Sequence, residues 1–273
     1  MSVKLSLAHL TTLDTSPPDL ITLAAEAGYD FASLRLREVT PGDAFPIVGD
    51  AAMMRETKAR IAATGVGVLD VELIRMTPEA QPEDFIPMLD AAAELGARHV
   101  LTQAHDPEWP RLRDHYVAIC DLAGERGLTA DIEFLTWTKM PTLKDAAFLA
   151  MASERANAGV MVDSLHFSRS NCDPGEIAAL PPRLFHYMQL ADAPAPAPRT
   201  VEGLIHTARA ARLMPGEGAL DLTTILLALP PETPISVEIP NAELAARMPD
   251  LQRVRAALDA TKSLLRSIGR TSS

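Results

Sequence analysis

A unit of one strand followed by one helix recurs along this chain of 273 residues, and this repeat restricts the possible folds most. Short runs rich in Val, Ile and Leu alternate with longer amphipathic stretches, about 30 residues apart. The predicted strands cover residues 3–9, 31–36, 66–74, 98–103, 129–134, 159–163, 185–190 and 234–238. Eight such units predict an α/β fold, a single (β/α)8 barrel over 1–268 with a flexible tail at 269–273.

The amphipathic stretches between the strands predict the helices. They cover residues 17–27, 50–64, 82–95, 108–126, 141–156, 173–180, 221–229 and 243–268. Several end in a glycine just before the next strand, as at Gly28 and Gly65, because glycine supplies the left-handed residue that closes a helix. The proline-rich segment 193–198 is interpreted as the start of a long loop. A doubly wound open sheet is the alternative, but no Gly-x-Gly-x-x-Gly follows the first strand.

Composition and charge limit the partners. The net charge of −11 and the pI of about 5.1 argue against nucleic acid or an anionic membrane as a partner. No run of 18 or more apolar residues predicts a membrane span, and the first residues lack the pattern of a secretory signal. Cys120 and Cys172 do not form a CxxC motif, so no disulfide framework is expected. We therefore expect a cytoplasmic protein, with a homo-oligomer left open.

Alternation within a strand predicts which side chains point into the barrel. In the strand at 66–74, Asp70 and Glu72 share one face, while Leu69 and Leu73 share the other. The polar set is expected inside the barrel and the apolar set beneath the outer helices.

Polar residues occupy the ends of the last four predicted strands. A parallel strand covered on both faces should be apolar throughout, yet these strands carry Glu133, Asp163, Gln189 and Glu238. The C-terminal strand ends of a barrel meet at one face, where active sites are built. Three carboxylates and an amide oxygen suit one hard divalent cation, Mn²⁺ or Mg²⁺ first, with Co²⁺ or Zn²⁺ as alternatives. The competing interpretation makes each acid a loop cap or half of an internal ion pair.

Other ionisable residues lie near the same strand ends. His166 has an ordinary pKa of about 6.5 and could serve as a base or contact substrate, or else contact only backbone near a helix start. Arg37, Glu72 and His105 are candidate substrate-binding residues at or just beyond the second, third and fourth strands. Arg37 could hold a carboxylate or phosphate, and Glu72 could orient it. Glu72 and His105 could instead form an internal hydrogen-bonded pair. Four further histidines are interpreted as structural or surface residues: His99, His115, His186 and His206.

Four motifs, in this order, resemble those of a known superfamily: Asp163-Ser-Leu-His166, Met188-Gln-Leu-Ala-Asp192-Ala, Arg212-Leu-Met-Pro-Gly-Glu-Gly218 and Val237-Glu238. They resemble the xylose-isomerase-like TIM barrels, known also as sugar phosphate isomerases/epimerases. The resemblance implies that Glu133, Asp163, Gln189 and Glu238 bind the metal. It also implies that Arg212 contacts the oxygens of a small polar substrate, which is a sugar, a sugar phosphate or a polyhydroxy acid. The glycines after Arg212 would let backbone approach a ligand.

Two reactions follow from this resemblance. In an isomerase or epimerase, the first expectation, the metal would stabilise an enediolate while Glu133 and Glu238 remove and return a proton. The strand-seven residue is usually His in ketose epimerases, whereas Gln189 is similar to some bacterial 3-dehydroshikimate dehydratases. In that lyase a β-hydroxyl would leave, with His166 as base and Arg37 or Arg212 holding a carboxylate.

Two further alternatives belong to other classes. An abasic-site endonuclease shares the barrel, but net charge opposes it and a second set of His ligands is hard to find. A non-catalytic barrel that binds a small molecule predicts that chelators have no effect.

Overall fold

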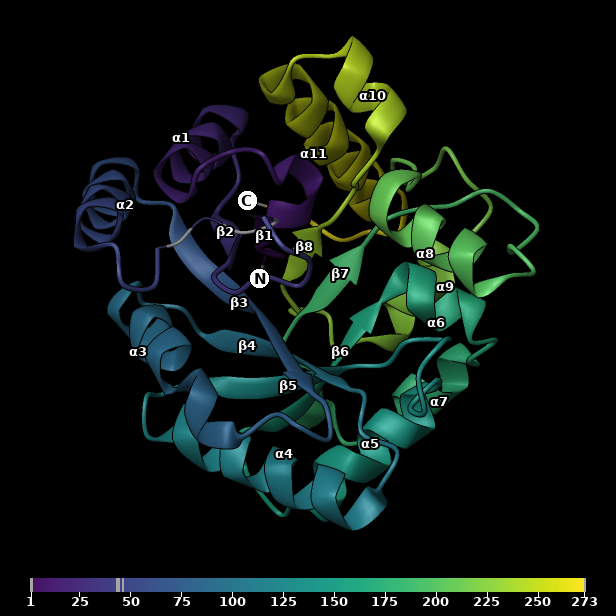
Figure 1. The fold of residues 1–273 in the computed structure, drawn as a ribbon. Helices are drawn as coiled ribbons and strands as arrows, with labels where there is room; N and C mark the ends of the chain where they lie inside the picture. Colours follow the sequence, from purple (N-terminus) through teal and green to yellow (C-terminus); the bar gives the residue numbers. More distant parts are fainter. Residues whose placement is uncertain (1, 43–44, 46, 273) are drawn as a thin grey trace.

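Eight parallel strands close into a barrel in sequence order in the computed structural model, which describes residues 2–42, 45 and 47–272. The helices lie around this barrel (Figure 1). The strands are β1 Leu5–Leu7, β2 Phe31–Arg35, β3 Gly67–Met76, β4 His99–Ala104, β5 Thr129–Glu133, β6 Ala158–Asp163, β7 Met188–Leu190 and β8 Ile235–Val237. The predicted single (β/α)8 barrel is therefore confirmed.

The outer layer follows the predicted helices closely for most of its length. The helices are α1 Pro17–Ala27, α2 Ala51–Thr64, α3 Ile86–Glu94, α4 Trp109–Gly124, α5 Leu143–Ala152, α6 Ser164–Arg169, α7 Pro174–Ala179, α8 Val201–Ala210, α9 Leu222–Ala228, α10 Ala242–Arg247 and α11 Asp250–Ser267. Short 3-10 helices cover His9–Thr12 (η1), Pro82–Phe85 (η2) and Pro182–Leu184 (η3).

Three parts of the outer layer differ from the prediction, and one is α6, which lies where no helix was expected. The expected single helix at 243–268 is split, because Met248 precedes Pro249 and adopts an extended conformation, which a residue before proline prefers. The stretch after the proline-rich segment was expected to be loop but contains α8. The Thr200 side chain caps this helix by accepting a hydrogen bond from the Gly203 backbone N–H at 3.1 Å.

The barrel interior contains a second apolar cluster besides the main core beneath the helices. It consists of Leu69, Leu73, Leu101, Met161 and Tyr187. The expectation that Leu69 and Leu73 pack beneath the outer helices is therefore wrong. The register of β3 shifts against β2 between Val68 and Val71 and against β4 between Val71 and Ile74, and such irregularities break strict alternation.

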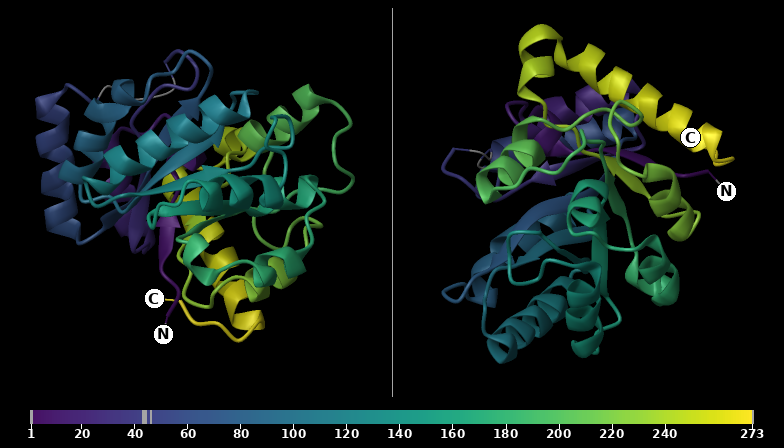
Figure 2. Two further views of the ribbon diagram at one scale, coloured as in Figure 1. Left: turned by 90° about the horizontal axis from the view of Figure 1, so that it is seen from below. Right: turned by 90° about the vertical axis from the view of Figure 1, so that its right-hand side faces the viewer.

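The two ends of the chain lie side by side (Figure 2). The Val3 backbone N–H donates to the Thr271 carbonyl at 2.8 Å, and Val3 bridges Ser272. The flexibility expected of 269–273 stays a prediction.

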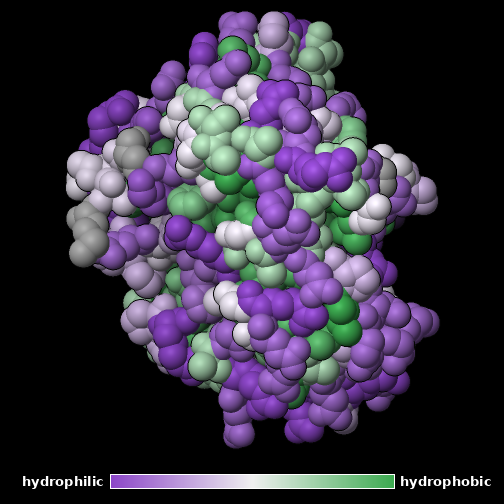
Figure 3. All heavy atoms as spheres, turned by 90° about the vertical axis from the view of Figure 1, so that its left-hand side faces the viewer, coloured by the Kyte–Doolittle hydropathy of each residue, from purple (hydrophilic) through white to green (hydrophobic). Residues whose placement is uncertain are grey.

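The face of the molecule shown in Figure 3 is mostly hydrophilic, with patches of hydrophobic residues among the hydrophilic ones. Within the described residues, no helix is both long and apolar enough to cross a membrane.

Candidate active site

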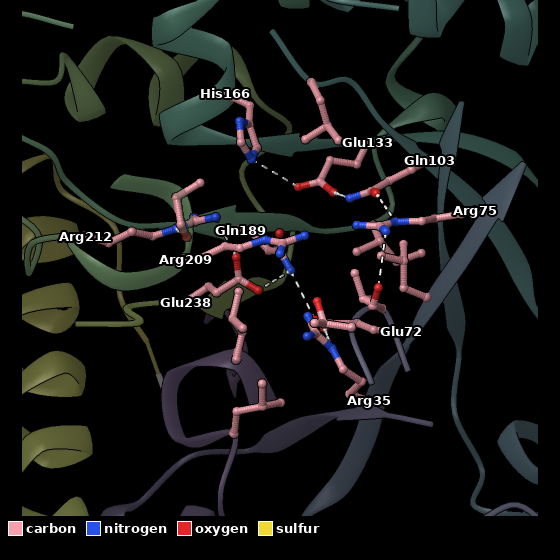
Figure 4. Close-up of a pocket in the computed structure, with 18 of the residues that line it drawn as sticks. Arg35, Glu72, Arg75, Gln103, Glu133, His166, Gln189, Arg209, Arg212 and Glu238 are labelled. Atoms are coloured by element: carbon pink, nitrogen blue, oxygen red, sulfur yellow. Dashed lines mark hydrogen bonds and ion pairs between the residues drawn. The ribbon is translucent and has the colours of Figure 1, made fainter. Parts of the chain in front are cut away.

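A cavity of about 270 Å³ lies at the C-terminal ends of the strands. Figure 4 shows that charged side chains from many strands and loops point into it. Its polar lining consists of Arg35, Thr40, Glu72, Arg75, Gln103, Glu133, His166, Gln189, Arg209, Arg212 and Glu238. Most of the site residues predicted from the sequence therefore meet in one place.

The four predicted metal ligands come from adjacent strands. Glu133 ends β5, Asp163 ends β6, Gln189 lies in β7, and Glu238 follows β8. Asp163 pairs with Gln189 across the strands, and Gln189 pairs with Ser236. All four predicted ligands are buried, with exposed fractions of 5% or less. The fold thus gathers three carboxylates and one amide from residues far apart in sequence.

Asp163 is both a helix cap and half of an internal ion pair, the two roles that the competing interpretation gives to such an acid. Its Oδ1 accepts hydrogen bonds from the backbone N–H groups of Leu165 at 2.7 Å and His166 at 3.1 Å, so it caps α6. This cap places His166 in the first turn, with its Nε2 3.6 Å from Glu133 Oε1. The Trp137 ring meets the His166 ring edge-on, with centroids 5.1 Å apart. His166 therefore faces the carboxylates rather than backbone alone.

Arg212 joins two of the predicted ligands. Its guanidinium lies 2.6 Å from Asp163 Oδ2 and 2.8 Å from Glu238 Oε2, and its Nε donates to the Ala208 carbonyl at 2.8 Å. The side chain is 2% exposed. The Arg212 backbone N–H also donates to Pro240, which ties the loop after β7 to the loop after β8. In this position Arg212 both balances two buried acids and lines the cavity.

The backbone of the turn 215–218, which follows Arg212, binds the side chain of Asp192. Asp192 Oδ2 accepts hydrogen bonds from the backbone N–H groups of Gly216 and Gly218, each at 3.0 Å. A Cβ atom at Gly218 would lie 2.3 Å from Asp192 Oδ1, so this position requires glycine. The close approach expected for a ligand is thus made to Asp192, and it anchors the loop that carries Arg212.

Burial raises the proton affinity of all three acids, but neighbouring charges reverse its effect at Asp163. Burial, reinforced by the charge of Asp163, raises the pKa of Glu133 to about 8. Burial also raises the pKa of Glu238 well above its ordinary value, although Arg212 opposes the change. Burial acts the same way on Asp163, but Arg212 and His166 outweigh it, so the pKa of Asp163 is lowered. Glu133 therefore holds a proton at neutral pH unless a cation displaces it.

Two buried atoms of the site lack a hydrogen-bond partner among the described residues: Gln189 Oε1 and His166 Nδ1. The amide nitrogen of Gln189, in contrast, donates to Glu238 Oε1 at 3.0 Å. Burial lowers the pKa of His166 to about 4, so its ring is neutral at physiological pH. Unpartnered buried acceptors are costly, which indicates that a ligand completes this site.

Arg35, rather than Arg37, reaches the cavity from β2. Arg35 forms an ion pair with Glu72 at 3.1 Å. The exposed Arg37 instead stacks on the Phe85 ring, 4.6 Å from its centroid, and donates to the Asp84 carbonyl at 3.4 Å. Alternation puts both arginines on one face, but β2 ends at Arg35, so the rule no longer applies at Arg37. The structure does not bring Arg37 to the cavity.

His105 does not line the cavity but contacts it through Gln103. Its Nε2 lies 3.2 Å from Gln103 Oε1, and the Gln103 amide donates to Glu133. Burial and the charge of Arg75 lower the pKa of His105 to about 4. The expected pair of Glu72 and His105 does not form, since Glu72 pairs with Arg35.

Several cavity residues were not singled out from the sequence: Arg35, Arg75, Gln103 and Arg209. The strand-end rule could have found the first three, because each lies in a strand near its C-terminal end. Arg209 offered no such signal, because it lies on α8, where a loop was expected.

A closed barrel with acids, arginines and a histidine at its C-terminal mouth defines the class of (β/α)8 barrels with an enzyme-like site. A family model described as xylose isomerase-like TIM barrel matches residues 21–264. The chain therefore belongs to this family, as its motifs predicted.

Two curated relatives carry the name 3-dehydroshikimate dehydratase. The protein of Pseudomonas aeruginosa is 28% identical over 252 residues, which are 86% of this chain and 38% of the relative. That of Pseudomonas putida is 28% identical over 277 residues, covering 95% of this chain and 41% of the relative. The chain thus spans about two fifths of the length of these relatives.

Solved structures of low sequence identity share the fold. The IOLI protein, solved with a zinc atom, has a TM-score of 0.81 at 18% identity and covers 97% of this chain and 99% of its own. D-allulose 3-epimerase from Methylomonas sp., in complex with D-allulose, has a TM-score of 0.70 at 16% identity, covering 98% and 96%. Dehydratases and epimerases are thus both among the proteins similar to this chain.

Proposed function

We propose that the protein is a metal-dependent lyase that removes water from a small polyhydroxy acid, as a 3-dehydroshikimate dehydratase does. The dehydratase names of the two relatives support this reaction, as does Gln189 at the strand-seven position. The observation that carries the proposal is the arginine content of the cavity.

Four arginines and four acids surround the cavity, and their charges balance only when all four acids are ionised. The arginines are Arg35, Arg75, Arg209 and Arg212. The acids are Glu72, Glu133 and Glu238, with Asp163 behind them in its ion pair with Arg212. A divalent cation would add two positive charges to this set. A substrate that carries a carboxylate would then be attracted electrostatically, whereas an uncharged sugar would not.

The residues present fit such a cation. Oxygen donors from three carboxylates and one amide suit Mg²⁺ or Mn²⁺, with Co²⁺ or Zn²⁺ as alternatives. The unpartnered Gln189 Oε1 is a buried acceptor of the kind that a metal would satisfy. We assign Glu133, Asp163, Gln189 and Glu238 as the ligands. When bound, the cation would supply positive charge for a substrate oxygen on which negative charge develops.

His166 is the base in this proposal. Its low pKa keeps the ring neutral, so it can accept a proton from the carbon next to the substrate ketone. The electrons of that C–H bond form a carbon–carbon double bond as the β-hydroxyl leaves. The imidazolium then returns the proton to the leaving oxygen, which departs as water. Glu133, 3.6 Å from His166 Nε2, would stabilise the imidazolium once it is ionised.

The arginines position the substrate acid. Arg209 lies on α8 and points into the cavity (Figure 4), and among the described residues it has no hydrogen bond or ion pair. Arg212 is held by Asp163 and Glu238, so it presents a fixed charge beside the proposed ligands. We assign Arg209 to hold the substrate carboxylate and Arg212 to contact a substrate oxygen near the reacting carbon.

An isomerase or epimerase is the second candidate. Glu133 ends β5 and Glu238 follows β8, with β6 and β7 between them, so they approach the cavity from different sides. Such a pair could remove a proton and return it to the opposite face of a ketose. The fold shared with D-allulose 3-epimerase is compatible with this reaction.

One substrate panel separates the two reactions. The protein is incubated with 3-dehydroshikimate and with ketoses, in Mn²⁺, Mg²⁺, Co²⁺, Zn²⁺ or EDTA. We expect a new aromatic absorbance from 3-dehydroshikimate, lost in EDTA. Epimerised ketose without any aromatic product would refute the dehydratase and select the second candidate. Turnover that EDTA does not change would refute the metal-dependent mechanism.

A further inference from the structure

A second group of ionisable side chains lies at the other end of the barrel, near the N-terminal ends of the strands. His99 is the first residue of β4, Asp131 lies in β5, and His186 precedes β7. We call these three residues the basal cluster. Asp131 is completely buried, while the side chains of His99 and His186 are 11% and 20% exposed.

Both imidazoles of the basal cluster face the same carboxylate. His186 Nδ1 lies 2.7 Å from Asp131 Oδ1, and His99 Nδ1 lies 3.8 Å from Asp131 Oδ2. The two rings are stacked 10° from parallel, with centroids 5.8 Å apart. One ligand atom from each residue falls within 4.8 Å of the others. Three donors therefore converge from three separate segments of the chain.

The chain keeps space for this convergence. Gly159 pairs with Asp131 across the strands. A Cβ atom at Gly159 would lie 2.2 Å from Asp131 Oδ1 and 2.5 Å from His186 Nδ1. Any residue other than glycine would therefore displace the carboxylate or the imidazole.

The hydrogen bonds of Asp131 do not explain why two histidines face this carboxylate. Thr129 Oγ1 donates to Asp131 Oδ2 at 2.5 Å and lies 2.7 Å from His99 Nδ1. Asp131 thus has one hydroxyl donor and one imidazole donor without His99. The carboxylate is nevertheless buried, and among the described residues its ion-pair partners are the two histidines. A buried carboxylate needs a compensating positive charge. Burial lowers the pKa of His186, but the hydrogen bond and charge of Asp131 outweigh it and raise that pKa, so either a protonated His186 or a bound cation can supply the charge.

We propose that the basal cluster is a second divalent metal site, with His99, Asp131 and His186 as ligands. Two imidazoles and one carboxylate with a fourth position open suit Zn²⁺ better than Mg²⁺. With Zn²⁺ bonds of about 2.0–2.2 Å, tetrahedral ligands lie about 3.3 Å apart. The separations are 2.7 Å from His186 Nδ1 to Asp131 Oδ1 and 3.8 Å from His99 Nδ1 to Asp131 Oδ2, so they lie on either side of that value and involve the two oxygens of one carboxylate. The partly exposed histidines give the ion access from solvent.

A metal here would tie three neighbouring segments of the barrel together far from the mouth. It would therefore stabilise the fold rather than take part in the reaction, and it does not depend on which reaction the mouth catalyses. A metal that binds the folded chain and not the unfolded one raises the melting temperature.

The test counts metal ions in each variant after removal of all metal and titration with Zn²⁺. We expect two Zn²⁺ per chain in the unsubstituted protein and one in the His186→Gln variant. Gln can still donate to Asp131, so this variant keeps the hydrogen bond while losing the imidazole ligand. The exposed His206 provides a matched control, and His206→Gln should bind two. The Glu133→Gln variant should lose the other ion and, with Co²⁺, still show tetrahedral absorption bands.

Two results would overturn the proposal. One is equal Zn²⁺ stoichiometry in the unsubstituted protein and His186→Gln. The other is a Glu133→Gln variant without tetrahedral Co²⁺ bands. Melting curves provide a second readout, because Zn²⁺ should raise the melting temperature of Glu133→Gln but not that of the Glu133→Gln/His186→Gln double variant. Equal shifts in both would likewise exclude the basal cluster as the site.

Discussion

The two ends of the barrel both gather ionisable residues, but with different chemistry. At the mouth the donors are mainly oxygens, an arginine spans two of the acids, and Gln189 Oε1 has no partner among the described residues. At the base the donors are mainly imidazoles, and Asp131 has both a hydroxyl and an imidazole against it. The mouth therefore presents an unpartnered acceptor to a ligand, whereas at the base Asp131 already has hydrogen-bond donors and a metal ion would replace the imidazole donor.

The difference follows from which segments supply the residues. The mouth receives His166, Arg209 and Arg212 from the segments that follow β6 and β7. The basal cluster takes its residues from the strands themselves or from the position just before one. Segments after the strands are the usual source of side chains that contact a substrate. The four predictions below test this comparison, beginning with the largest effect.

Loss of a proposed metal ligand should abolish turnover. In Glu238→Gln the carboxylate that faces Arg212 and Gln189 is removed, and we expect kcat/KM to fall about 1,000-fold or more. The measurement is the initial rate on the substrate that the panel identifies. The exposed Glu243 serves as the control, and Glu243→Gln should retain full activity. Comparable rates in both variants would show that the mouth does not carry the reaction.

Removal of the buried arginine should destabilise the metal-free protein. Arg212→Met leaves Asp163 and Glu238 without their common partner, which should lower the free energy of unfolding by about 3 kcal/mol. Added metal ion should restore part of the loss. Urea unfolding with and without Mn²⁺ measures both effects. Arg247, in an exposed ion pair, is the control, and Arg247→Met should change stability by about 0.5 kcal/mol or less. Equal losses would contradict the role given to Arg212.

Arg209 should affect binding and leave stability unchanged. Because Arg209 has no polar partner among the described residues, Arg209→Met costs the folded chain no ion pair. A lost charged hydrogen bond is worth about 1.5–3 kcal/mol, so KM should rise about 10- to 100-fold. Steady-state kinetics and urea unfolding distinguish the effect of Arg209→Met from that of Arg212→Met. An unchanged KM for an acidic substrate would place the substrate carboxylate elsewhere.

Metal affinity at the mouth should depend on pH. In the metal-free protein Glu133 has a pKa of about 8, so below that pH a proton must leave before the metal can bind. The affinity should therefore fall by at least about tenfold per pH unit below about 8, because Glu238, whose pKa is also raised, must lose its proton as well. Calorimetric titration between about pH 6.5 and 9 also measures the released proton. A flat profile would mean that Glu133 is not a ligand.

The same proton affects stability in the metal-free protein. The folded state holds the Glu133 proton up to about pH 8, while the unfolded state releases it near its ordinary pKa of 4.5. Since the folded state binds more protons, the contribution of Glu133 to stability falls as pH rises between these two values.

Sequence patterns predicted the barrel and the proposed ligand positions because both depend on local rules. Eight apolar runs set the strands, and a carboxylate such as Asp163 at a strand end must come to the mouth once the barrel closes. Arg209 was missed because the prolines before α8 suggested a loop. Arg37 was chosen over Arg35 because sequence alone does not show where β2 stops.

The basal cluster was out of reach for a different reason. His99 and His186 are 87 positions apart and are brought together by the strand order, with the glycine at 159 making the space. Single histidines at strand starts carry no pattern of their own. Only closure of the barrel makes them neighbours.

The bridge between Val3 and Ser272 places both chain ends near the start of β1, away from the cavity. A short peptide joining these ends, with a new opening cut in an exposed loop, should yield a circular permutant with the mouth intact. Any tag or fused module attached at either terminus would likewise leave the path of substrate into the barrel clear.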